Sequence, residues 1–190
     1  MKSLVVLLSG NGSNLQAIID RIAQENWPLK IAAVISDKPN AYGLIRAQQA
    51  NIPTHVFPSK LYPGMCEYHQ ALQDCIGAYQ PDLIVLAGYM RILAPEFVNH
   101  FAGKIINIHP SLLPAYKGLH THERVLEAHE KYHGTSIHIV TADLDDGPLL
   151  AQERIEIAPD DTAETLKAKV QALEHRLYPE VIYRQVIAAS

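Results

Sequence analysis

Asn107 and His109 are the two side chains whose types and spacing most directly suggest chemistry. Asn107 lies inside an apolar run at residues 105–108 and His109 directly follows it, and such a run is typical of a buried strand. Side chains two apart on a strand share a face, so the amide and the imidazole should leave it together. Pro110 cannot donate to a strand ladder and disfavours the helical region for His109, so the strand should end there. Ligands of open α/β sheets bind at this end of the strands, which makes the pair a candidate site.

A Gly-Asn-Gly-Ser-Asn turn at residues 10–14 is the second candidate. It lies between an apolar run at residues 4–8 and a stretch with helical apolar spacing. Glycines let the backbone approach a ligand closely, and free N–H groups at a helix start favour a phosphate. Neither a P-loop lysine nor a third fingerprint glycine follows, so a small phosphate monoester fits better than a nucleoside triphosphate. An ordinary tight turn, capped by Ser13 or Asn14, explains the pattern about equally well.

The acidic segment Asp-Leu-Asp-Asp-Gly-Pro at residues 143–148 is the third candidate. A carboxylate beside an imidazole favours its protonated form and fixes its orientation, so Asp145 could serve His109. Composition alone favours the simpler interpretation of a solvated turn.

Metal binding is a weaker interpretation of the ten histidines. His109, His120, His122 and His138 fall near the expected cleft, but neither an H-E-x-x-H motif nor a cysteine partner accompanies them. Cys66 and Cys75 lack a C-x-x-C spacing, so we expect reduced, structural thiols.

Apolar runs alternate with amphipathic stretches through the first half of the chain, which predicts an α/β fold. We expect a doubly wound, mostly parallel sheet with helices on both faces. The uninterrupted apolar run at residues 83–87 should be a central strand, and helices are expected at residues 41–50, 65–79 and 123–130. Residues 135–140 and 149–157 lack a helical crossover between them, so they should form an antiparallel C-terminal strand pair. A last helix, capped near Thr162, should run from 163 to about 177 and end or kink at Pro179.

Length and charge limit the class of protein. A chain of 190 residues suggests one domain over residues 1–190, and a net charge of −4 without any basic tract argues against nucleic-acid binding. The apolar N-terminal run is too short for a signal segment, so we expect a cytoplasmic protein that does not associate with membranes.

The three segments, together with residues 86–93, 118–122 and 133–136, resemble the phosphoribosylglycinamide formyltransferases, a branch of the formyltetrahydrofolate-dependent formyltransferase family. The motif Asn-x-His-Pro-Ser-Leu-Leu-Pro with a downstream aspartate resembles a motif of the wider family. The Gly-Asn-Gly-Ser-Asn turn resembles the turn found in the phosphoribosylglycinamide formyltransferase branch.

The resemblance implies a role for each segment. Asn107, His109 and Asp145 would be catalytic. The phosphoribosylglycinamide site would be formed by Gly12, Ser13, Asn14, Thr141, Ala142, Asp143, Leu144, Gln171 and Glu174. The folate site would be formed by Met90, Arg91, Ile92, Leu93 and Asn107. Residues 1–100 would then be the phosphate-binding half, and residues 101–190 the folate-binding and catalytic half.

Two positions depart from the family pattern. Met65 stands where the family usually has an arginine able to meet the folate glutamate tail, and Asp146 replaces the first glycine of Leu-Asp-Gly-Gly-Pro. If residue 146 needs a positive φ, aspartate would adopt it at some cost, and its carboxylate could compete with Asp145 for the histidine or repel the substrate phosphate.

The expected activity is therefore formyl transfer from 10-formyltetrahydrofolate to the amine of phosphoribosylglycinamide, a step of purine biosynthesis, without a metal. The expected partners are small-molecule substrates, and the protein would be a monomer or a homodimer. A hydrolase that uses water as the acceptor and a non-catalytic folate-binding protein are the alternatives.

Overall fold

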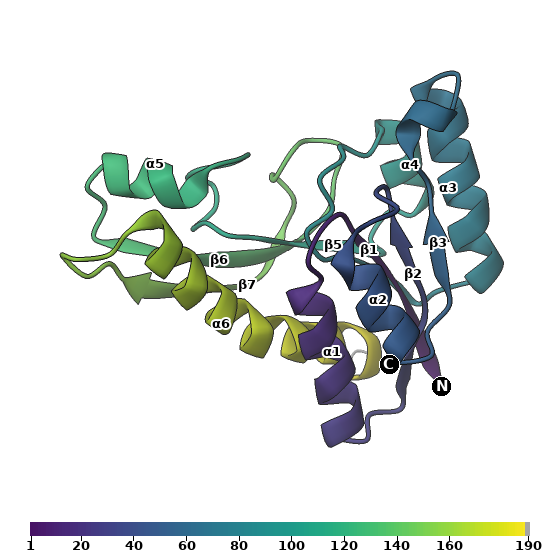
Figure 1. The fold of residues 1–190 in the computed structure, drawn as a ribbon, viewed down its shortest axis with the longest axis horizontal. Helices are drawn as coiled ribbons and strands as arrows, with labels where there is room; N and C mark the ends of the chain where they lie inside the picture. The colour runs from purple at the N-terminus through teal and green to yellow at the C-terminus, as the bar shows by residue number, and fades with distance from the viewer. Residues whose placement is uncertain (189–190) are drawn as a thin grey trace.

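A single seven-stranded sheet runs through the computed structural model, which describes residues 1–188 (Figure 1). Its strand order is β3-β2-β1-β4-β5-β6-β7. The strands are β1 (Lys2–Leu8), β2 (Leu29–Ser36), β3 (Thr54–Val56), β4 (Leu83–Leu86), β5 (Ile105–His109), β6 (Tyr132–Ile139) and β7 (Leu149–Glu156). The pairings among the first five strands are parallel, whereas β6 is antiparallel to both β5 and β7. The predicted fold class, including the antiparallel C-terminal pair, is confirmed.

Helices cover both faces of the parallel strands. They are α1 (Ser13–Gln24), α2 (Tyr42–Gln49), α3 (Met65–Tyr79), α4 (Pro95–His100), α5 (Thr121–Glu127) and α6 (Ala163–Tyr183), with short helical turns at Ser59–Leu61 and Arg184–Ala188. Along β1, Val6 and Leu8 join a buried cluster with α1, α2 and α6, and Val5 and Leu7 join a second cluster with α3 and α4. Because both faces of the central strands are covered, these strands are apolar throughout rather than alternating.

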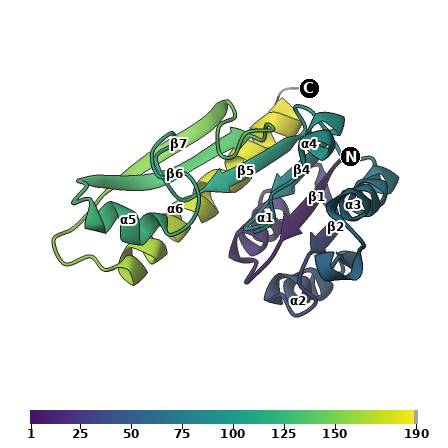
Figure 2. The ribbon, with the colours of Figure 1, turned by 90° about the horizontal axis from the view of Figure 1, so that it is seen from above.

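The antiparallel strands extend the sheet to one side. Figures 1 and 2 show β6, β7 and α5 projecting away from the parallel strands, with α6 running along them back to α1. The N-terminal part of α6 therefore lies against β6, and its later turns pack in the cluster of β1 and α1. Through this helix, parts of the chain far apart in sequence meet beside the start of α1.

Two helix predictions were wrong in detail, and one short helix was missed. Pro179 does not end α6, which continues to Tyr183, and the side chains around the proline, Tyr178, Val181 and Ile182, are fully buried. Core packing on this scale offsets the hydrogen bond that proline removes. Helix α5 begins at Thr121 and ends at Glu127, which is earlier than residues 123–130, and the short helix α4 was not predicted.

Two of the candidate segments and the expected folate-binding residues follow the carboxyl ends of neighbouring parallel strands. Strand β1 leads into residues 10–14, β4 leads into residues 87–93, and β5 ends at His109. The strand order changes direction between β1 and β4, and open α/β sheets bind ligands outside the carboxyl ends of the strands at such a point. None of the helices within residues 1–188 is long and apolar enough to cross a membrane.

Candidate functional site

Asn107 and His109 lie at the carboxyl end of β5, where the sequence pattern predicted them. The strand ends at His109, which is only 7% exposed, whereas Asn107 is half-buried. Antiparallel pairing with β6 sets His138 opposite Asn107 and Ser136 opposite His109. The amide and the imidazole are therefore held by strands on both sides of β5.

The His109 ring lies between two oxygen acceptors. Its Nδ1 lies 3.5 Å from Oδ2 of Asp145, and its Nε2 lies 2.9 Å from the backbone carbonyl oxygen of Tyr116. A neutral imidazole carries one N–H and can satisfy only one acceptor, whereas an imidazolium can donate to both. An oxygen acceptor therefore stands at each nitrogen of the His109 ring, and together the two acceptors orient the ring.

Asp145 is fixed in an unusual backbone conformation. Its φ is +50°, and Oδ2 accepts a hydrogen bond of 3.0 Å from the Gly118 N–H. The positive φ that we considered for residue 146 is therefore found one residue earlier. Asp146 is exposed and pairs with Lys117, an interaction that lowers the pKa of the Asp146 carboxyl, and it forms no ion pair with the histidine. Competition between the two carboxylates for His109 is accordingly not observed.

Gly147 explains how the loop that carries Asp145 reaches the site. A Cβ atom at this position would lie 1.6 Å from the carbonyl oxygen of Ile139 in β6, so only glycine allows the backbone to pass this close. The loop is thereby held against the strand opposite Asn107.

His138 positions the Asn107 amide. Its Nδ1 lies 3.0 Å from the Ile139 carbonyl oxygen, so this nitrogen carries the proton and Nε2 can accept a hydrogen bond of 3.4 Å from Asn107 Nδ2. Burial lowers the pKa of His138, while the Ile139 carbonyl and Asp145, at 3.8 Å, act in the opposite direction. A neutral His138 leaves the second N–H of the amide available for a ligand oxygen.

The glycine turn, our name for residues 10–14, presents free backbone donors. Helix α1 begins at Ser13 with Gly12 as its N-cap, at a φ of +77°, and no side chain caps it. The alternative of a cap by Ser13 or Asn14 was wrong. Within the described chain, the N–H groups of residues 12–14 have no acceptor, so they are available to an anion at the positive end of the helix dipole.

Asn14 connects the glycine turn to α6. Its Nδ2 donates to Glu174 at 3.2 Å, and Glu174 also accepts from Thr135 Oγ1 at 3.2 Å. The buried Oδ1 of Asn14 has no partner, which leaves an acceptor for a ligand hydroxyl or amine. Burial raises the pKa of Glu174, although the two hydrogen bonds oppose this rise.

Comparison with known proteins identifies the family. The formyl transferase family model matches residues 2–182 of the chain. The chain belongs to the formyl transferase family. It is 48% identical to the phosphoribosylglycinamide formyltransferase of Haemophilus influenzae over 182 residues, which cover 96% of this chain and 86% of that protein.

Two solved structures show how closely this formyl transferase is related to others. The phosphoribosylglycinamide formyltransferase of Coxiella burnetii superposes with a TM-score of 0.91 at 57% identity, covering 95% of this chain and 84% of that one. The phosphoribosylglycinamide formyltransferase of Bacillus halodurans superposes with a TM-score of 0.95 at 40% identity, covering 100% of this chain and 97% of that one.

The residues expected to bind folate follow β4. In this formyl transferase Met90 and Ile92 are 61% and 72% exposed, whereas Leu93 is buried and Arg91 is half-buried. The Met90 N–H donates to Ser9 Oγ at 2.8 Å, and Ser9 Oγ donates to the buried Asp37 at 2.6 Å. Because Ser9 directly precedes the glycine turn, this chain of hydrogen bonds fixes residue 90 relative to it.

The other residues expected at the phosphoribosylglycinamide site lie on two elements. Ala142, Asp143 and Leu144 are exposed in the loop after β6, together with the half-buried Thr141. Gln171 is half-buried on α6, in the turn before Glu174. Both segments are thus at least partly exposed, and Gln171 lies one turn before Glu174.

The remaining histidines are arranged differently from a metal site. His122 Nδ1 lies 2.9 Å from His133 Nε2, and burial is the main cause that lowers the pKa of His133 to about 4. His138 contacts Asn107 instead, and His120 precedes α5 at a φ of +57°. Among residues 1–188 no group of three or more His, Cys, Asp or Glu side chains is placed to hold a metal ion.

Several residues of this site were missed from the sequence. His138 was considered only as a metal ligand, although an antiparallel β5–β6 register could have predicted its place opposite Asn107. The carbonyl of Tyr116 and the N–H of Gly118 act through the backbone, so their residue types carried no signal. Lys117 and Asp146 meet across two loops whose packing no local pattern predicts.

Proposed function

We propose that this formyl transferase moves the formyl group of 10-formyltetrahydrofolate to the amine of phosphoribosylglycinamide, a step of purine biosynthesis. The observation that carries the proposal is the grouping of His109, Asn107 and Asp145 at the end of β5, on the same sheet edge as the uncapped glycine turn. Such a site can bring an acceptor phosphate and a formyl donor to one side of the sheet.

In this proposal the acceptor lies between the glycine turn and α6. The N–H groups at residues 12–14 bind the phosphate, aided by the Ser13 hydroxyl, and Asn14 with Glu174 takes ribose hydroxyls or the amine. Gln171 and the segment 141–144 complete the acceptor site. The pterin of the donor lies against residues 90–93, next to Asn107. The division into a phosphate-binding half and a catalytic half at about residue 100 is part of the same proposal.

The reaction follows from the donors at Asn107 and His109. The neutral amine attacks the formyl carbon, and a tetrahedral oxyanion forms. The free N–H of Asn107 and the protonated His109 stabilise this charge, while Asp145 holds the imidazolium in place. The intermediate collapses as the C–N bond to the folate breaks. The attacking nitrogen loses one proton, and the departing folate nitrogen gains one, through His109 or a water that it orients.

One contact must change during this sequence. The carbonyl of Tyr116 accepts from His109 Nε2 at 2.9 Å, and this is the nitrogen that the mechanism assigns to the oxyanion. Tyr116 has a φ of +56°, which is an uncommon conformation for a residue with a side chain. We expect the loop around Tyr116 to withdraw its carbonyl when the formyl oxygen arrives.

The test is a kinetic assay that follows folate deformylation with and without phosphoribosylglycinamide. Turnover that requires the acceptor supports transfer. Deformylation at an equal rate without the acceptor would instead identify a hydrolase, and saturable folate binding without turnover would identify a binding protein. A chelator is expected to leave the rate unchanged, because no step of the proposed mechanism uses a metal.

A further inference from the structure

We propose that Arg46 is a positioning residue that aims the glycine turn at the acceptor phosphate. The proposal rests on the function proposed above and extends it to a residue on α2. It begins with the close contact between α2 and the turn. The Gly43 N–H donates to the Gly10 carbonyl at 3.0 Å, and a Cβ on Gly12 would lie 2.5 Å from the Gly43 Cα. The outer side of the turn is therefore closed by α2.

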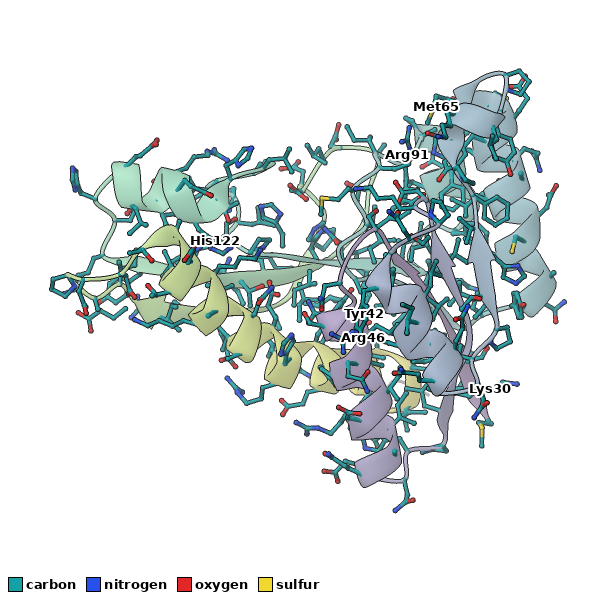
Figure 3. All side chains as sticks on the ribbon, in the orientation of Figure 1. Lys30, Tyr42, Arg46, Met65, Arg91 and His122 are labelled. Atoms are coloured by element: carbon teal, nitrogen blue, oxygen red, sulfur yellow. The ribbon has the colours of Figure 1, made fainter. Side chains whose placement is uncertain are left out.

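Arg46 holds Asn11 by its backbone and its side chain together. Its Nε donates to the Asn11 carbonyl oxygen at 2.8 Å, and its Nη2 donates to Asn11 Oδ1 at 2.8 Å. The guanidinium also lies over the Tyr42 ring, 4.9 Å from its centroid, and Figure 3 shows the two side chains together. A planar guanidinium with two donors on one residue restricts its orientation more than a single hydrogen bond does.

Fixing the Asn11 carbonyl also fixes the direction of the next N–H. The two groups belong to one planar trans peptide, so they point in opposite directions. With the carbonyl turned toward Arg46, the Gly12 N–H is turned away from α2, and within residues 1–188 it has no acceptor. Arg46 thereby orients a donor that the proposed function assigns to the phosphate, without itself needing to contact the phosphate.

The charge of Arg46 acts in the same direction. Within the described chain no carboxylate oxygen lies within 4 Å of its guanidinium, so its positive charge is not paired. That charge lies at the turn, since the guanidinium donates to Asn11 at 2.8 Å. After burial, Arg46 is also a cause of the lowered pKa of His175, whose Nε2 lies 3.0 Å from Ser13 Oγ. A phosphate dianion at the turn gains from both the oriented donor and the unpaired charge.

The experiment measures steady-state kinetics of Arg46→Gln and Arg46→Lys against the wild type. Arg46→Gln should raise the KM for phosphoribosylglycinamide by about 10- to 100-fold, with little change in kcat or in the folate KM. Arg46→Lys keeps the charge but cannot reproduce both hydrogen bonds, so its acceptor KM should lie between those of Arg46→Gln and the wild type. Inorganic phosphate should inhibit both variants more weakly than it inhibits the wild type.

Two controls separate positioning from general damage. Arg21→Gln removes an arginine of α1 that pairs with Glu180 at 3.8 Å, and it should leave the acceptor KM unchanged. The dephosphorylated acceptor, glycinamide riboside, should react with equal efficiency in the wild type and in Arg46→Lys. If Arg46→Gln fails to fold, the acceptor KM of Arg46→Lys alone is compared with that of the wild type.

Two results would overturn the positioning role. One is a KM of Arg46→Lys for phosphoribosylglycinamide equal to that of the wild type. The other is a loss of catalytic efficiency in Arg46→Lys that is as large with glycinamide riboside as with phosphoribosylglycinamide. Failure of the proposed function is distinguishable, because the wild type itself would then show no acceptor-dependent turnover.

Discussion

Nδ1 of His109 lies 3.5 Å from Oδ2 of Asp145, and the Gly118 N–H holds the same carboxylate oxygen at 3.0 Å. The Gly118 N–H thus fixes the Asp145 carboxylate. His109 is held by its place at the end of β5 and by its contact with this carboxylate. We expect this contact to hold the imidazole in the orientation that catalysis needs.

Asp145→Asn tests the charge of that contact. The amide preserves the size of the side chain but removes the countercharge, so kcat should fall by about 100-fold. The measurement is steady-state kcat, with Asp146→Asn as the matched control, because that carboxylate is exposed and pairs with Lys117. A kcat for Asp145→Asn equal to that of the wild type would show that the charge of Asp145 does not act on His109.

Gly147→Ala tests how the loop reaches the site. The new Cβ would meet the Ile139 carbonyl, so the free energy of unfolding should fall by about 1–3 kcal/mol, and kcat should fall as Asp145 moves. Gly77→Ala on α3 is the control, since a Cβ there meets nothing within 4 Å and should stabilise the helix slightly. Urea unfolding measures both variants. Equal stabilities for Gly147→Ala and the wild type would show that the loop has room to shift.

Glu174 should make stability depend on pH. Burial raises the pKa of this carboxyl above 4.5 in the folded state, so its contribution is fully present below 4.5 and is lost as the pH rises through the folded value. Relative to Glu174→Gln, which does not titrate, the wild type should become less stable over this interval. Urea unfolding between about pH 4 and about pH 8 measures the difference. A difference that is constant with pH would contradict a raised pKa.

Met65→Arg tests the departure at the start of α3. Met65 is 46% exposed, and Figure 3 shows it at the same end of the molecule as Arg91. A cation there should lower the KM for polyglutamylated folates by up to about fivefold, since an exposed ion pair contributes little. The matched control is Met65→Gln, which adds a polar group of similar size without charge. Equal changes for mono- and polyglutamylated folates would argue against a contact with the tail.

The sequence predicted those parts of the fold and site that depend on local patterns. Apolar runs located the strands, and Pro110 after His109 placed the end of β5 correctly. Thr162 caps α6 as expected, through a capping box with Thr165. Each of these features is determined by residues within a few positions of one another, so a local pattern was sufficient.

What the sequence did not predict depends on contacts between distant segments. The helix continues past Pro179 because the surrounding core is buried, and the positive φ falls at Asp145 because the loop is held by Gly118 and by the close approach of Gly147. His138 reaches Asn107 only through the β5–β6 register, and Arg46 reaches Asn11 only through the packing of α2. The catalytic and binding roles of all these residues stay predictions.

The most direct test of the account follows the formyl group itself. We would incubate the enzyme with 10-formyltetrahydrofolate labelled in the formyl carbon and with phosphoribosylglycinamide, and then separate the products. The account predicts label in the formylated amine for the wild type, and a rate lower by about 10²- to 10⁴-fold for a folded His109→Ala variant. Label released as formate by the wild type, or wild-type rates in His109→Ala, would contradict it.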